Sequence, residues 1–88
     1  MATTEEVLEN RGGDYGDYEY MSRVAQNLKN VMNTGTSSLN FAQQESVDMI
    51  CTKLSRIACG NPNKSDTWQD IAGYATLIVN ILEKEKYQ

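Results

Sequence analysis

Histidine is missing from this chain of 88 residues, and several kinds of functional site are excluded with it. Without histidine there is no Ser-His-Asp triad, no Cys-His nucleophile pair and no imidazole ligand for a metal. The two cysteines, Cys51 and Cys59, are too few for a four-ligand zinc site. On one helix they lie about 12 Å apart, because a helix rises about 1.5 Å per residue, and a disulfide cannot span that distance. Free thiols are typical of a reducing, cytoplasmic compartment.

Basic residues and long apolar runs are also scarce. Twelve acidic residues against eight basic residues give a net charge of −4. This balance argues against direct nucleic-acid binding, which needs a basic face. No apolar run is long enough to cross a bilayer, and the first ten residues are acidic and polar, unlike a signal peptide. We therefore expect a cytoplasmic protein that contacts neither membrane nor nucleic acid.

One proline and six glycines leave little room for a series of β-turns. Apolar residues instead recur at spacings of three and four, which is typical of amphipathic helices. Helices are expected over residues 18–33, from Asn40 to Gly60, and from Ser65 or Asp66 to about residue 85. The predicted fold is a single all-α domain spanning residues 1–88. It has a short N-terminal helix and turn in 1–17 and a helical core in 18–88.

The last expected helix is apolar on two sides. Its main stripe, which we expect to be buried, consists of Trp68, Ile71, Ala72, Ala75, Ile78, Val79 and Leu82. At 100° per residue, Tyr74, Leu77 and Ile81 lie about 180–240° away from Trp68. A helix that is apolar on two sides is buried on two sides, and one chain of this length has too few helices to surround it. The pattern predicts a helical-bundle homo-oligomer.

Four carboxylates form two pairs at helical spacing. Glu45 and Asp48 are three residues apart, and Asp66 and Asp70 are four apart, so each pair points one way. Two such pairs on neighbouring helices could hold Mg²⁺ through oxygen ligands. The alternative is a solvated helix face, with Asp66 an ordinary acid at a helix N-terminus. Asp70 differs, because it falls on the second apolar face and there needs either a partner or a metal.

Cations and tyrosines near these acids suggest a ligand with phosphate groups and a base. Lys53 and Arg56 could hold phosphate oxygens, or could serve as salt-bridge partners of the acids. Tyr15, in a segment with three tyrosines, and Tyr74 could stack on a nucleobase. The alternative is that these rings pack a loop onto the core.

Three segments together resemble a known family. They are R-G-G-D-Y-G-D from Arg11, E-S-V-D-M-I-C-T-K-L-S-R-I from Glu45, and D-T-W-Q-D-I-A-G-Y from Asp66. Over residues 9–81 they look like small phage and prophage proteins of unknown function. The same order of motifs is similar, more distantly, to phage nucleotide-modification-associated proteins and to MazG-like all-α nucleoside triphosphate pyrophosphatases.

The MazG-like resemblance implies an oligomeric four-helix core that binds Mg²⁺ through an E-x-x-E pair and a later E-x-x-D pair. Glu45 and Asp48 match the first pair, and Asp70 matches the final aspartate. Thr67 stands where the resemblance places a glutamate, and Asp66 is one residue earlier. The resemblance therefore implies nucleotide binding and leaves pyrophosphatase activity open.

Two other functions remain open from the sequence. One is a non-enzymatic phage counter-defence or host-interaction protein, which sequesters a nucleotide or nucleotide-derived molecule, or binds a host protein. The other is a purely structural helical oligomer.

Overall fold

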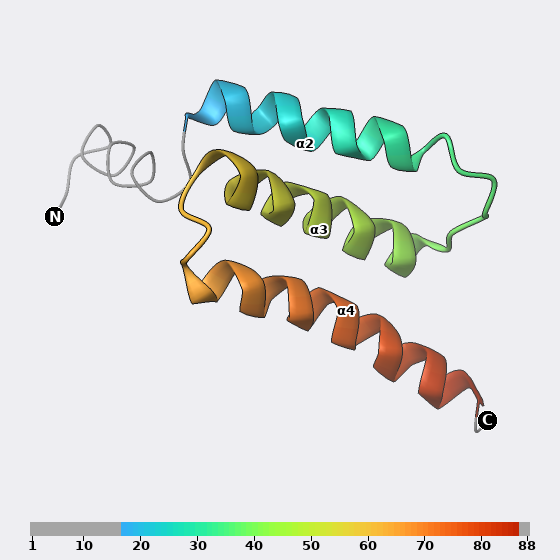
Figure 1. The fold of residues 1–88 in the computed structure, drawn as a ribbon. Helices are drawn as coiled ribbons and strands as arrows, with labels where there is room; N and C mark the ends of the chain where they lie inside the picture. The colour runs from blue at the N-terminus through green and yellow to red at the C-terminus, as the bar shows by residue number, and fades with distance from the viewer. Residues whose placement is uncertain (1–16, 87–88) are drawn as a thin grey trace, which may run out of the picture.

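A computed structural model describes residues 17–86 of the chain, and within that range it contains three α-helices and no strand. The helices are α2 (Tyr18–Met32), α3 (Phe41–Cys59) and α4 (Ser65–Lys86) (Figure 1). The predicted all-α class and the three helical segments are confirmed. The short helix predicted before residue 17 lies outside the described residues. None of the described helices combines the length and apolar character needed to cross a bilayer.

The helix ends follow from local capping residues. The carboxylate of Asp17 accepts hydrogen bonds from the backbone N–H groups of Glu19, at 2.9 Å, and Tyr20, at 3.2 Å. The expected capping box opens α3: Gln43 N–H donates to Asn40 Oδ1 at 2.8 Å, and Asn40 N–H donates to Gln43 Oε1 at 3.0 Å. Gly60 ends α3, where its N–H donates to a carbonyl oxygen of the last turn at 2.9 Å.

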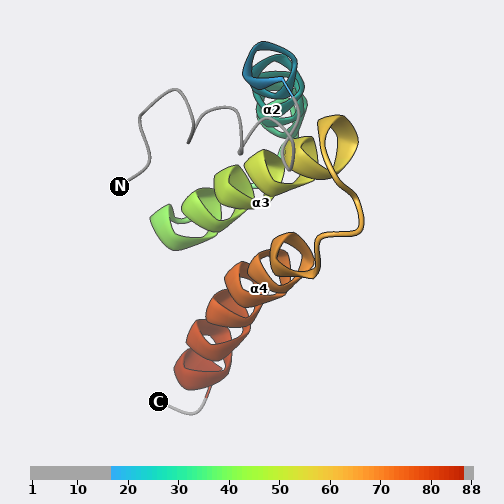
Figure 2. The same ribbon diagram turned by 90° about the vertical axis from the view of Figure 1, so that its left-hand side faces the viewer.

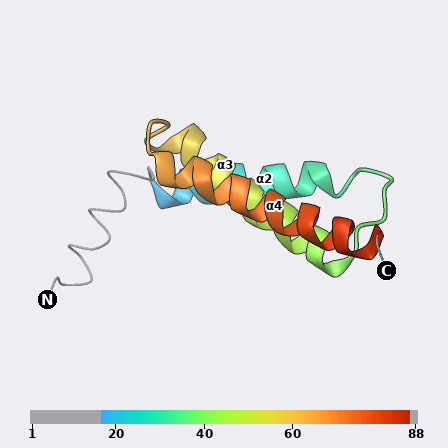
Figure 3. The same cartoon turned by 90° about the horizontal axis from the view of Figure 1, so that it is seen from below.

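The three helices form one layer with α3 in the middle. Helix α3 packs against both α2 and α4, whereas α2 and α4 do not contact each other within the described residues. Figures 1 and 2 show α2 and α4 on opposite sides of α3, and Figure 3 shows α4 running along α3. Consecutive helices are antiparallel. Among residues 17–86, no helix covers the two broad surfaces of the layer.

Few side chains are buried between the helices. Among the described residues, the buried apolar side chains are Met21, Ala25 and Cys51, which are 7%, 5% and 4% exposed. Small polar residues occupy much of the rest of the contacts: Ser46 and Ser55 on α3 and Thr67 on α4 are also buried. Small side chains let helix backbones approach closely, but they bury little apolar area. The described layer therefore has a thin hydrophobic core.

Helix α4 packs on α3 along an edge that the sequence analysis anticipated only in part, because Ile71 and Ile78 belong to the predicted main stripe and Thr67 and Tyr74 do not. The residues of α4 that are buried or half-buried recur at helical spacing: Thr67, Ile71, Tyr74 and Ile78. At 100° per residue they point between the two predicted apolar faces. Ser46 Oγ donates a hydrogen bond to the backbone carbonyl of Tyr74 at 3.3 Å and ties the two helices together.

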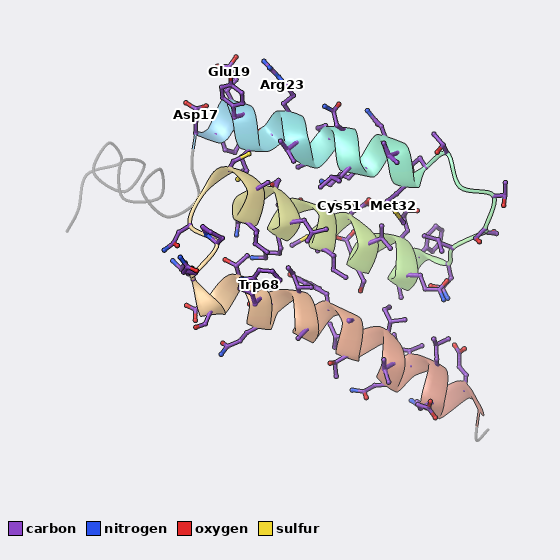
Figure 4. All side chains as sticks on the ribbon, in the orientation of Figure 1. Asp17, Glu19, Arg23, Met32, Cys51 and Trp68 are labelled. Carbon is purple, nitrogen blue, oxygen red and sulfur yellow. The ribbon has the colours of Figure 1, made fainter. Side chains whose placement is uncertain are left out.

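The expected burial of the main stripe of α4 is found only in part within one chain. Ile71 and Ile78 of the stripe are half-buried against α3, whereas Trp68, Val79 and Leu82 are 52%, 54% and 45% exposed. The reason is that α4 contacts α3 through one edge of this stripe, so the side chains centred on Trp68 point away from α3. Trp68 instead donates its indole N–H to the carbonyl of Pro62 at 2.8 Å, and Figure 4 shows it at the start of α4.

The rotation of α3 explains why the layer has two different faces. Cys51 and Ser55 point toward α2, and Ser46 and Lys53 point almost oppositely, toward α4. The remaining two sides of α3 are open. Leu54 projects from one of them and is 39% exposed, and the exposed Glu45 projects from the other. We call these sides of the layer the apolar face and the polar face.

Candidate functional site

The candidate residues of the sequence analysis gather on the polar face and at its seam between α3 and α4. At 100° per residue Glu45 and Arg56 point to this face from α3, and Asp66 and Asp70 point to it from α4. Lys53 and Tyr74 lie at the seam. Asp48 is the exception, because it lies on the side of α3 that turns toward α2. Tyr15 lies outside the described residues.

An ion pair joins the two helices at the seam. Lys53 Nζ lies 2.9 Å from Asp70 Oδ2, and the two side chains are 12% and 49% exposed. The sequence left two alternatives for Asp70, a partner or a metal, and in this structure Lys53 is the partner. The Lys53 side chain is the more buried member of the pair, and the Asp70 side chain keeps about half of its surface open to solvent.

A shallow, open pocket begins at this ion pair. Its volume is about 370 Å³, and it is lined by Asp70, Gly73, Tyr74 and Leu77. Gly73 contributes the open space, because no atom lies within 4 Å of the position that a Cβ would occupy there. One end of the pocket is therefore charged, and the other end presents an aromatic ring and a leucine that is 56% exposed.

The other predicted carboxylates do not join Asp70 at this pocket. Asp48 accepts a hydrogen bond at 3.0 Å from the Gln44 side chain, within α3. Glu45 and Asp66 are exposed, Asp66 in the first turn of α4. Among residues 17–86 no three carboxylate or thiol side chains come close enough to share a metal ion. One chain thus offers separate acidic side chains here, with Asp70 the carboxylate that lines the pocket.

Thr67 occupies a position where the family resemblance places a glutamate. Its side chain is 4% exposed, and its N–H donates to the carbonyl of Lys64 at 3.2 Å. This position faces α3 rather than the pocket. A carboxylate here would be buried in the helix contact, so the local structure is consistent with threonine.

Both cysteines are free thiols, as the sequence analysis expected. Cys51 is 4% exposed, and Cys59 is half-buried. The pKa of Cys51 is raised from its ordinary value of 9.0, first because burial disfavours the thiolate and second because Asp48 is near. Lys29 of α2 acts in the opposite direction. A thiol with a raised pKa is a poor nucleophile, so Cys51 is structural.

Sequence reasoning missed two lining residues, Gly73 and Leu77, as parts of a site. The available signal was the glycine itself, because glycine inside a helix lowers helix stability and often has a packing or functional reason. Leu77 gave no such signal, since its apolar side chain fitted the expected oligomer contact equally well.

Comparison with known families places the chain but assigns it no activity. A family model described as "Domain of unknown function (DUF6378)" matches residues 1–82. The chain belongs to this family. No curated protein and no solved structure matches the sequence. The DUF6378 match covers all three described helices, apart from the last residues of α4, and every residue that lines the pocket.

Proposed function

We propose that this protein binds a nucleotide, accompanied by Mg²⁺, at the pocket on α4 beside the α3–α4 seam. The observation that carries the proposal is the ion pair at the edge of the pocket, in which Lys53, whose side chain is 12% exposed, meets Asp70, whose side chain is 49% exposed. A cation and an anion held side by side complement a magnesium-bound phosphate, which carries both charges. Lys53 would hold phosphate oxygens and Asp70 would face the ion.

The rest of the pocket suits the base or ribose of such a ligand. Tyr74 offers a ring for stacking, and Leu77 adds apolar contact beside it. Gly73 leaves space above the helix backbone. The volume, about 370 Å³, falls at the lower end of the range of small-molecule sites, roughly 300–1,000 Å³. Arg56, three residues after Lys53, adds a second cation on the same side of α3.

The residues fit an ion that arrives with the nucleotide better than an ion held by the protein alone. Mg²⁺ is commonly bound through one or two carboxylates, with phosphate oxygens and water as its other ligands. Asp70 supplies one such carboxylate at the pocket. The ion would offset the phosphate charge next to Asp70, and the protein would contribute position and charge.

Binding without turnover is the form of this function that the site supports best. Thr67, in place of the glutamate of the MazG-like motif, is buried in the contact with α3 and cannot act as a metal ligand. The resemblance of the motifs to phage proteins supports a phage-encoded protein that sequesters a nucleotide or nucleotide-derived molecule in the host cytoplasm.

A thermal-shift panel tests the proposal. The full chain is heated with nucleoside mono-, di- and triphosphates and cyclic dinucleotides, each with and without Mg²⁺. A ligand at 100 times its Kd stabilises a protein by about 2.7 kcal/mol. In a domain of this size that corresponds to a rise in Tm of roughly 10–20 °C. We expect such a rise with at least one nucleotide plus Mg²⁺, and no rise with Mg²⁺ alone.

A matched pair of lysine variants locates the ligand. Lys53→Met removes the cation at the pocket and keeps the apolar stem, whereas Lys84→Met removes an exposed cation near the end of α4. Lys53→Met should abolish the nucleotide-dependent rise, and Lys84→Met should retain it. Equal loss in both variants, or no response of the wild-type protein to any nucleotide, would contradict the proposal.

A further inference from the structure

The apolar face of the layer is a continuous surface that no described residue covers. Side chains from all three helices contribute: Val24, Leu28 and Val31 from α2, Val47, Ile50 and Leu54 from α3, and Trp68, Ala72, Ala75, Val79 and Leu82 from α4. Its most open large members are Val31 and Val79, 68% and 54% exposed, followed by Trp68 at 52%. Extended apolar surfaces of this kind mark interaction sites.

Within the three described helices, no charged residue before Glu83 lies on the apolar face. At 100° per residue, the charged residues of each helix point at least about 90° away from it. These residues are Glu19, Arg23 and Lys29 on α2, Glu45, Asp48, Lys53 and Arg56 on α3, and Asp66 and Asp70 on α4. Depletion of charge, together with an aromatic residue such as Trp68, is the composition of the buried centre of a protein interface.

We propose that a second copy of this chain covers the apolar face, so that two layers pack face to face around a twofold axis. A twofold axis sets the same surface against itself, and a charged surface would repel its copy. The chain has a net charge of −4, and this face is the broad surface of the layer on which two copies meet without that repulsion.

The size of the face matches what a stable dimer needs. Helices rise about 1.5 Å per residue and pack about 8–10 Å apart, so three helices present a face on the order of 700 Å². Stable interfaces bury about 800 Å² per partner.

The dimer also supplies the core that one chain lacks. Among the described residues, three apolar side chains are buried, which is little for a domain that must offset its loss of conformational entropy. Face-to-face packing buries the stripe of α4 centred on Trp68, and leaves the pocket at Gly73 open, because the pocket lies on the opposite side of α4. Dimerisation and nucleotide binding are therefore separable.

Two substitutions on α4 provide the test. Val79 and Leu77 are almost equally exposed, 54% and 56%, but they lie on opposite sides of the helix. Val79→Asp places a charge in the proposed interface once per chain, and Leu77→Asp places the same charge on the polar face. Analytical ultracentrifugation of the full-length proteins gives the mass and the dimer dissociation constant, and circular dichroism reports helix content.

The wild type and Leu77→Asp should sediment as dimers. Val79→Asp should raise the dissociation constant at least about 100-fold, or lose helix content at concentrations where Leu77→Asp remains folded, because an unpaired charge in an apolar interface is strongly unfavourable. The milder Val79→Ala should remain folded and dissociate more readily than the wild type. A monomeric wild type, or a Val79→Asp dimer as tight as the wild type, would overturn the proposal.

Discussion

Replacing Asp70 with asparagine removes the negative charge of the seam ion pair and keeps the shape of the side chain. Lys53 then retains its positive charge with an ammonium group whose side chain is only 12% exposed. The reverse change, Lys53→Met, leaves the negative charge on Asp70, which is 49% exposed and can be hydrated where it stands. The two single substitutions therefore have unequal consequences, although they break the same contact.

The magnitudes follow from the two exposures. Exposed ion pairs contribute about 0.2–1 kcal/mol, and removing one partner of a fully buried pair costs about 3–5 kcal/mol. Asp70→Asn lies between these limits, and we expect a loss of about 2 kcal/mol, or a fall in Tm of roughly 8–16 °C. Lys53→Met should cost less than about 1 kcal/mol, since the remaining carboxylate is solvated. The double variant should resemble Lys53→Met.

Urea denaturation measures the free energies of unfolding of the wild type, the two single variants and the double variant. All four are compared at one fixed protein concentration, because the stability of an oligomer depends on concentration. Leu77→Asp, which leaves the ion pair intact, controls for changes in the polar face. If Lys53→Met proved as destabilising as Asp70→Asn, or if neither change altered stability, the reasoning from burial would be refuted.

Three further predictions concern single residues. A thiol reagent should label Cys59 well before Cys51, and equal labelling rates would contradict the assignment of Cys51 as a buried thiol. Because the pKa of Cys51 is raised above 9.0 in the folded state, the free energy of unfolding should fall as the pH rises past about 9, and Cys51→Ala should flatten that dependence. Asn40→Ala should lower the free energy of unfolding by about 1 kcal/mol, while Asn40→Ser should change it little, and equal losses in the two variants would show that the cap does not act through its side-chain acceptor. Gly73→Ala should raise the free energy of unfolding by about 0.5–1 kcal/mol, because the new Cβ would meet no atom within 4 Å. The same change should weaken nucleotide binding by narrowing the pocket. A fall in Tm would show that the site is more crowded than the structure indicates.

The helices could be predicted because their signals are local. Asn40 and Gln43 are three residues apart and form their capping box without help from the rest of the chain. The apolar spacing then fixes the helical state over the following turns. Gly60 marks the end of α3 for an equally local reason. The starts and ends of α2, α3 and α4 accordingly fall within about a residue or two of the predicted positions.

The rotation of α4 could not be predicted, because its sequence is apolar on two sides. Periodicity favoured the stripe centred on Trp68 as the inner face, but the contact with α3 lies to one side of Trp68 and includes Thr67 and Tyr74 as well as two residues of the stripe. Small polar residues such as Ser46 and Thr67 make that close contact, and they carry no hydrophobic signal. Without the rotation, the pairing of Asp70 with Lys53 remained one of two alternatives.

The predicted magnesium site also depended on an arrangement between helices that the sequence does not fix. Helical spacing gives the direction of each carboxylate around its own helix, but it does not fix distances between helices. In the structure Asp48 bonds within α3 to Gln44, and Asp70 pairs with Lys53. Four carboxylates that form two pairs at helical spacing in the sequence therefore do not come together at one site within the described residues of one chain.

The central claim is that a magnesium-bound nucleotide occupies the pocket. NMR chemical shifts of the backbone amides of the full-length protein, followed during a titration with magnesium and a nucleoside triphosphate, test it most directly. The amide signals of Gly73 and Tyr74 lie at the proposed site, and those of Leu54 and Val79 lie on the apolar face and serve as internal controls. The account predicts shifts concentrated around Asp70, Gly73 and Tyr74 that saturate with the nucleotide and do not occur with magnesium alone. Shifts centred on the apolar face, or no saturable shift with any nucleotide that is tried, would contradict it.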